Sequence, residues 1–206
     1  MGWKENDGEY SMRIEPRKDQ GRLQRKPDLP GKGITRFREV LLRHGLFVLM
    51  LALVCFGLPQ RRAWLEWGLE RFFAYPLAYF LAALCLLLFL ILMTKVYDRI
   101  LNTRQFLWIV YLLGVSICEE WVFRLAVPGL TAGFIGLFPA VLLCNLVFAA
   151  MHYFTLRWKI RWCAGAFLGA MGLSRLMGHG DLILVIGVHW LATFLNTPVP
   201  VGTKDK

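Results

Sequence analysis

The sequence predicts an all-α integral membrane protein with about six transmembrane helices, four of which surround an intramembrane site. First, 57% of the 206 residues are hydrophobic and only 18% are charged, whereas soluble domains are nearer half apolar and a quarter charged. Second, residues 1–44 are polar, and the rest consists mostly of apolar blocks separated by short basic clusters. Basic loops beside membrane spans explain the formal charge of +10, so we expect a lipid bilayer and no nucleic acid as partner.

Six apolar blocks are expected to form the helices that cross the bilayer. They are residues 37–58, 72–94, 106–127, 133–154, 162–177 and 181–196. At about 1.5 Å of rise per residue, the last two blocks barely cross about 30 Å of hydrocarbon. We therefore expect them to be supported by neighbouring helices or to end in a cavity lined by protein.

The distribution of Lys and Arg predicts the orientation of these spans. With six spans and an internal N-terminus, the inside segments hold 19 Lys and Arg residues and the outside loops hold 4, leaving out Arg124 within the third block. Positive residues concentrate on the cytoplasmic side, so we expect both termini there. Residues 1–36 mix both charges with Gly and Pro, which is typical of a disordered tail.

The fifth block contains small residues at regular spacing. Gly165, Gly169 and Gly172 follow a Gly-xxx-Gly pattern, which lets helix backbones approach closely in membranes. We therefore expect this block to pack tightly against its neighbours.

The third block carries three ionisable residues in an apolar run: Glu119, Glu120 and Arg124. Three such groups cost about 8–10 kcal/mol to insert, against about 5–9 kcal/mol returned by the apolar residues of the same span. Glu120 and Arg124 are four residues apart, so they are predicted to form a structural ion pair on one helix face. Glu119 is rotated about 100° away and lacks a local partner, which favours a catalytic or transport role.

Two histidines in later blocks are candidate partners of Glu119. His152 lies late in the fourth block, and His189 lies midway along the sixth. Helices three and four run in opposite directions, and side chains lean toward the N-terminus of their helix. Glu119 and His152 therefore both move toward the midplane, where His189 already lies, and the three are expected to converge in one cavity.

Further polar residues share faces with these histidines. Asn145 lies seven residues before His152, and Thr193 and Asn196 follow His189 at spacings of four and seven. We regard Asn145 and Asn196 as possible auxiliary residues and Thr193 as a candidate hydrogen-bond donor. Such donors stabilise the oxyanion of a tetrahedral intermediate.

These residue types suit peptide hydrolysis without a covalent intermediate. A carboxylate in an apolar cavity can act as general base toward water, and histidines can hold that water or donate to an oxyanion. Two alternatives stay open: Cys118 as a nucleophile paired with histidine, and zinc held by two histidines and a glutamate. No HExxH helix is present, so no cofactor is expected, with zinc kept as the exception.

The motifs resemble those of a known family. The sequence contains Glu119-Glu120-xxx-Arg124, then Phe148-xxx-His152, a Gly-rich helix, and a short span with His189. This order is similar to the CPBP family of type II CAAX prenyl endopeptidases and bacteriocin-processing or immunity-type membrane proteins. The resemblance covers residues 105–197. It implies a catalytic core there, after two N-terminal spans in 37–104 and before a C-terminal tail at 198–206.

The resemblance also implies roles for individual residues. The family is regarded as glutamic-type intramembrane proteases, so Glu119 resembles the water-activating base and His152 its partner. Glu120 and Arg124 resemble the ion pair that shapes the site, and His189 resembles the histidine on the oxyanion side. The implied substrate is a membrane-associated, C-terminally tagged or lipidated peptide or protein, and the implied location is a bacterial inner membrane.

One position departs from the family pattern. The family usually has Asn or Asp four residues after the last histidine, where this chain has Thr193. A threonine hydroxyl can donate one hydrogen bond, and loss of an oxyanion donor costs about 10²–10³ in rate. The departure motivates an alternative, a non-catalytic immunity-type or peptide-binding protein of the same fold. A proton-coupled transporter is a third hypothesis, disfavoured because no inverted repeat is detectable.

Overall fold

The computed structural model describes residues 37–98 and 103–196, which form helices and no strand. The tails predicted at 1–36 and 198–206 lie outside the described residues. The elements are α1 (Phe37–Val40), η1 (Leu41–Gly45), α2 (Leu46–Phe56), α3 (Arg61–Ala74), α4 (Pro76–Asp98), α5 (Thr103–Glu120), η2 (Trp121–Ala126), α6 (Val127–Ile135), α7 (Leu137–Leu156), α8 (Ile160–Met177) and α9 (Leu182–Asn196), where η1 and η2 are π-helical. The predicted all-α class is confirmed.

Four helical segments are long and apolar enough to cross a membrane. They are Phe37–Phe56, Pro76–Val96, Phe106–Ile135 and Leu137–Leu156. The fifth and sixth predicted blocks form α8 and α9, and α9, with 15 residues, is a shorter apolar helix. Large apolar side chains on these helices are exposed, as expected of surfaces that face lipid. Whether α8 and α9 also cross the bilayer stays a prediction.

The third span is longer than the sequence predicted. It was expected to end at residue 127, but α5, η2 and α6 continue as one helical segment of 30 residues, Phe106–Ile135. The chain passes Pro128 without a break because η2 precedes it, and a π-helical turn already interrupts the regular hydrogen-bond ladder that proline would disrupt. The segment ends at Gly136, whose φ of +84° suits glycine.

A short helix was missed between the first two spans. Residues 61–71 were expected in an outside loop, but Arg61–Ala74 forms α3. Its buried Gly68 packs against the side chains of Leu125, Met177 and Leu182, whose atoms lie 3.0–3.5 Å from the place that a Cβ on residue 68 would take. A helix was not evident from the sequence because its arginines and tryptophans show no clear apolar stripe.

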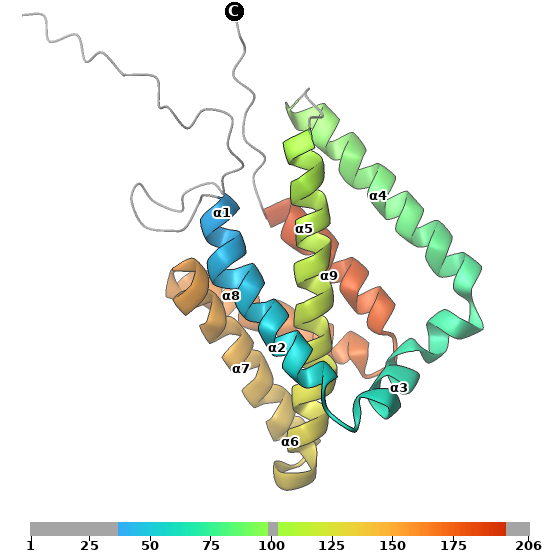
Figure 1. The fold of residues 1–206 in the computed structure, drawn as a ribbon, viewed down its shortest axis with the longest axis vertical. Coiled ribbons are helices and arrows are strands. Elements are labelled where there is room, and N and C mark those ends of the chain that lie inside the picture. Colours follow the sequence, from blue (N-terminus) through green and yellow to red (C-terminus); the bar gives the residue numbers. More distant parts are fainter. Residues whose placement is uncertain (1–36, 99–102, 197–206) are drawn as a thin grey trace, which may run out of the picture.

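The long segment α5–η2–α6 lies at the centre of the molecule (Figure 1). In the most apolar 18-residue stretch of this segment 56% of the residues are buried, whereas in the corresponding stretch of α4 only 11% are buried. Helices α2 and α7 lie on one side of it and α9 on the other, while α4 leans away from it (Figure 1). The centre of the fold is therefore the segment that carries the two adjacent glutamates.

Two indole groups fix the helices around this segment. Trp121 Nε1 donates to the carbonyl of Ala52 at 3.2 Å, which ties η2 to α2. Trp190 Nε1 donates to the carbonyl of Ile109 at 3.1 Å, which ties α9 to α5. Both bonds are buried, where an unmade bond would cost about 1–3 kcal/mol, so they hold α2 and α9 in register with the central segment.

The expected tight packing of the glycines in α8 is wrong within the described residues. Nothing lies within 4 Å of the position that a Cβ would take at Gly165, Gly169 or Gly172. The face of α8 that packs is instead formed by larger residues, Ala170, Leu173 and Met177. Their side chains fill the space between helices, so close backbone approach through the glycines is not needed.

Candidate active site

Glu119 lies in the last turn of α5 and is the centre of a buried polar cluster. Its side chain is only 2% exposed. Nε2 of His44 is 3.0 Å and Nε2 of His152 is 3.9 Å from its Oε1, and Nε2 of His189 is 3.6 Å from its Oε2. The structure thus brings together the three residues that the sequence selected, and it adds a third histidine, His44 from η1.

The other ring nitrogen of each predicted histidine is held by an acceptor. Nδ1 of His152 is 2.8 Å from the carbonyl oxygen of Phe148, and Nδ1 of His189 is 2.6 Å from Oε1 of Glu120. Because a carbonyl and a carboxylate accept hydrogen bonds, both Nδ1 atoms carry the proton. In the neutral ring the lone pair then lies on Nε2, which is directed at Glu119.

The predicted ion pair between Glu120 and Arg124 forms. Nε of Arg124 is 3.0 Å from Oε2 of Glu120, and both side chains are fully buried. The other oxygen of Glu120 holds His189, so Glu120 uses one oxygen for the pair and one for a histidine of the site. The pair is therefore connected to Glu119 through His189, a link that helical spacing alone did not indicate.

Asn145 supports the arginine of this pair rather than Glu119 directly. Its Oδ1 accepts a hydrogen bond from Nη1 of Arg124 at 2.9 Å. Its Nδ2 donates to Oγ of Ser174 at 3.0 Å and lies 3.1 Å from Sδ of Met171. The predicted auxiliary residue thus connects the central segment to α8.

Phe148 forms the apolar wall of the site. Its ring centroid is 4.7 Å from that of His152 and 5.9 Å from that of His189. The guanidinium carbon of Arg124 lies 4.9 Å from the same ring, a cation–π distance. One aromatic ring therefore contacts both predicted histidines and the cation of the ion pair.

The residues that follow His189 differ in their positions. Thr193 is half-buried one turn beyond His189 on α9. Asn196 is exposed, and its Nδ2 donates to the carbonyl of Ala192 in its own helix at 2.8 Å. The structure does not bring Asn196 to the site, because α9 runs straight on from His189 without the shift that would turn this amide inward.

His44 is the residue of the cluster that sequence reasoning missed. It is buried, with 4% of its surface exposed, although the first block was treated only as an apolar span. The signal available was the pair Arg43 and His44 within that block, which breaks its apolar run. A polar residue inside a span is expected to have a partner at depth, and here the partner is Glu119.

Three of these groups have the geometry to hold a metal ion. One ligand atom each from His44, Glu119 and His152 lies within 4.8 Å of the others, and all three residues are buried. Two histidines and a glutamate are a known zinc ligand set. The Phe148 carbonyl on Nδ1 of His152 is also the kind of partner that orients a metal ligand.

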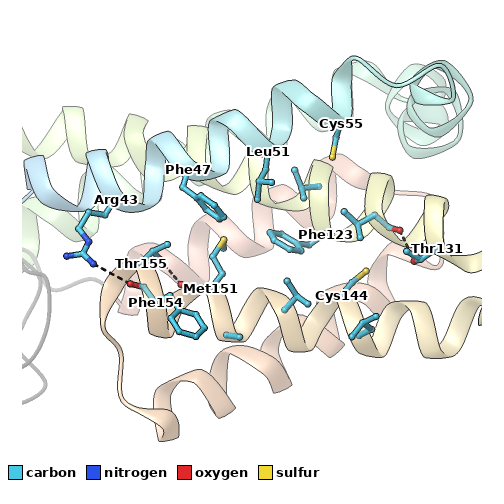
Figure 2. A pocket seen from close by; sticks show the side chains of 15 residues that line it. Arg43, Phe47, Leu51, Cys55, Phe123, Thr131, Cys144, Met151, Phe154 and Thr155 are labelled. Carbon is cyan, nitrogen blue, oxygen red and sulfur yellow. Dashed lines mark hydrogen bonds between the residues drawn. The ribbon is translucent and has the colours of Figure 1, made fainter.

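An apolar pocket of about 700 Å³ lies beside the cluster, between the first span, the central segment and α7 (Figure 2). Arg43 and Thr155 line one end, Thr131 and Cys144 the other, and the wall between them is mostly apolar. Glu119 is not among the lining residues. Thr155 connects the pocket to the cluster, because its hydroxyl is 2.9 Å from Nδ1 of His44.

Comparison with known families identifies the segment that carries most of this site. Residues 101–195 match the model of a family described as type II CAAX prenyl endopeptidase Rce1-like. The family resemblance predicted from the motifs is thereby confirmed for residues 101–195, which are similar to that family of membrane proteases. Comparison with curated proteins and with solved structures finds no match.

Proposed function

We propose that this protein is an intramembrane endopeptidase that hydrolyses a peptide bond with a water molecule activated by Glu119. The observation that carries the proposal is that Nε2 atoms from separate helices converge on one buried carboxylate, at 3.0, 3.6 and 3.9 Å. A carboxylate held in an apolar interior by basic groups is a suitable acceptor for a proton of water.

In the proposed reaction Glu119 takes a proton from water while the water oxygen attacks the scissile carbonyl carbon. The electrons of the carbonyl bond move to its oxygen, and the resulting oxyanion needs donors. His189 is suited to donate, because the Glu120 carboxylate on its Nδ1 stabilises an imidazolium whose Nε2 carries a proton. Collapse of the intermediate breaks the carbon–nitrogen bond, and Glu119 returns the proton to the leaving amine.

His152 is proposed to hold the water. Its Nδ1 is fixed by the Phe148 carbonyl, and its Nε2 is 3.9 Å from Oε1 of Glu119. A water about 2.8 Å from both atoms fits such a separation. Thr193, half-buried one turn after His189, is the proposed second donor to the oxyanion, in the place where the family usually has an amide or acid.

The substrate is proposed to be a membrane-associated peptide that is lipidated or carries a C-terminal tag. The apolar pocket beside the cluster would hold the apolar part of such a substrate (Figure 2). Arg43, at one end of the pocket, supplies a cation for a carboxylate or another anionic group. We propose no metal cofactor, no nucleic-acid partner, and a location in a bacterial inner membrane with both termini cytoplasmic.

The test uses purified full-length protein in detergent or liposomes with prenylated and unmodified membrane peptides. Wild type is expected to cleave at least one of them, and Glu119→Gln is expected to lower the rate by at least about 10²-fold. Glu66→Gln is the matched control, because Glu66 lies on α3 and is exposed. Equal cleavage by wild type and Glu119→Gln would refute the proposal, and peptide binding without cleavage by wild type would favour the non-catalytic alternative.

A further inference from the structure

His44 belongs to a part of the chain that the family match does not cover. The match spans residues 101–195, whereas His44 lies in the π-helical turn Leu41–Gly45 of the first span. π-Helical turns are rare and occur frequently at functional sites. Of the three histidines, His44 nonetheless makes the shortest approach to Glu119, 3.0 Å from Nε2 to Oε1.

The hydrogen bonds around Thr155 fix the proton on one nitrogen of His44. The hydroxyl of Thr155 donates to the carbonyl of Met151 at 2.7 Å. That hydroxyl has one proton to donate, so toward Nδ1 of His44, 2.9 Å away, it acts as acceptor. Nδ1 of His44 therefore carries a proton, and Nε2 is the nitrogen presented to Glu119.

The residue after His44 is a glycine that packs against the ring of Tyr111 on α5. A Cβ at Gly45, the residue after His44, would lie 2.8 Å from Cε2 of Tyr111 on α5. That distance is shorter than real side chains allow, so a side chain at residue 45 would force the ring of Tyr111 to shift. The sequence Arg43-His44-Gly45 thus places an imidazole against the helix that carries Glu119.

We propose that His44 is a positioning residue that acts through Glu119, an inference that rests on the proposed function. With Nδ1 protonated, a proton on Nε2 as well makes His44 an imidazolium, which forms an ion pair with the Glu119 carboxylate at 3.0 Å from Oε1. This contact fixes the orientation of the carboxylate and leaves the second lone pair of Oε1, on the side of His152, to take the proton of the attacking water. The water oxygen then bonds the carbonyl carbon, as in the proposed reaction.

The charged and titratable groups near His44 agree with this assignment. Glu119 on α5 and His152 on α7 face it, and the rings of His44 and His152 are 5.1 Å apart. Arg43 is directed away, to the carbonyl of Phe154 at 3.5 Å. Tyr111 of α5 packs beside the following glycine. Among these groups Glu119 is the acid in contact with His44.

Two amide substitutions separate positioning of Glu119 from a merely structural role. The amide nitrogen of His44→Gln reaches approximately the place of Nε2, so it can still donate to Glu119 but not to Thr155. The amide nitrogen of His44→Asn reaches approximately the place of Nδ1, so it keeps the contact with Thr155 and loses Glu119. If the proposal is right, His44→Asn lowers kcat by about 10²-fold with KM nearly unchanged, and His44→Gln retains several-fold more activity.

The controls make the outcome decisive. His179→Gln changes the exposed histidine of α8's C-terminal turn and is expected to leave kcat unchanged. If His44→Asn is as active as wild type, or more active than His44→Gln, while Glu119→Gln is inactive, the inference is wrong and the proposed function stands. If Glu119→Gln is itself active, the proposed function fails instead. Should neither His44 variant fold, Thr155→Val must lower kcat about tenfold, and an unchanged kcat overturns the inference.

Discussion

Glu120 is the residue whose substitution tests the architecture of the site most directly. Its two oxygens contact different groups: Oε1 accepts from Nδ1 of His189 at 2.6 Å, and Oε2 forms an ion pair with Nε of Arg124 at 3.0 Å. Glu120→Gln keeps the shape but turns one acceptor into a donor, so one of the two contacts becomes donor against donor. In either orientation Arg124 loses the negative charge that balances it in a fully buried position.

The expected loss of stability follows from these contacts. Breaking a buried pair by removing one charge costs about 3–5 kcal/mol, so we expect the free energy of unfolding of Glu120→Gln to fall by about that amount. The double variant Glu120→Gln/Arg124→Leu removes both charges and is expected to be more stable than Glu120→Gln alone. Because His189 loses its orienting carboxylate, kcat is also expected to fall by about 10²-fold or more. Reversible unfolding in detergent and cleavage kinetics measure the two effects.

An exposed pair on α3 provides the matched control. Arg62 and Glu66 have the same spacing of four residues and a 2.7 Å contact, but their side chains are 87% and 65% exposed. Exposed pairs contribute about 0–1 kcal/mol, so Glu66→Gln is expected to change stability by less than about 1 kcal/mol and not to change cleavage. If Glu120→Gln is no more destabilising than Glu66→Gln and retains kcat, the reasoning about the buried pair is refuted.

Three further outcomes are expected. Asn145→Ala removes the acceptor of Arg124 Nη1, so unfolding in detergent is expected to show a loss of about 1–3 kcal/mol, and no loss would contradict that role. Gly165→Leu is expected to leave folding and cleavage unchanged, since no atom lies within 4 Å of its Cβ position, and misfolding in monomeric detergent complexes would disagree. Chelators are expected to leave cleavage unchanged. Added Zn²⁺ is expected to inhibit cleavage by bridging Glu119 and the nearby imidazoles. His152→Gln is expected to weaken the binding of Zn²⁺, which calorimetry measures.

Much of the fold and of the cluster could be predicted because insertion into lipid makes polar residues conspicuous. An unpaired carboxylate and two histidines in apolar blocks are costly, and antiparallel neighbouring helices determine how their side chains lean. Those two rules were enough to select Glu119, His152 and His189 and to expect them in one place. A third rule, the spacing of four residues along one helix face, was enough to predict the pair of Glu120 and Arg124.

Other features depend on contacts between helices that sequence spacing does not encode. His44 reaches Glu119 through a π-helical turn and a glycine beside Tyr111, and neither is visible as a motif in the first block. For the glycines of α8, the sequence predicted a close packing that the structure does not show. A small residue permits close approach without requiring it, so the pattern at Gly165 says nothing about which face of the helix packs.

The adjacent glutamates of the central segment illustrate how neighbours in sequence acquire different chemistry. They are rotated by about 100° from each other on the helix, so they have different partners apart from His189, which contacts both. Glu120 faces a fixed cation, and its negative charge is balanced by Arg124 at 3.0 Å. Glu119 faces imidazoles from three other elements, whose Nε2 atoms can give or take a proton. The estimated cost of inserting three charges is thus reduced by one permanent pair, and the remaining carboxylate is left with partners that exchange protons, which is what a general base requires.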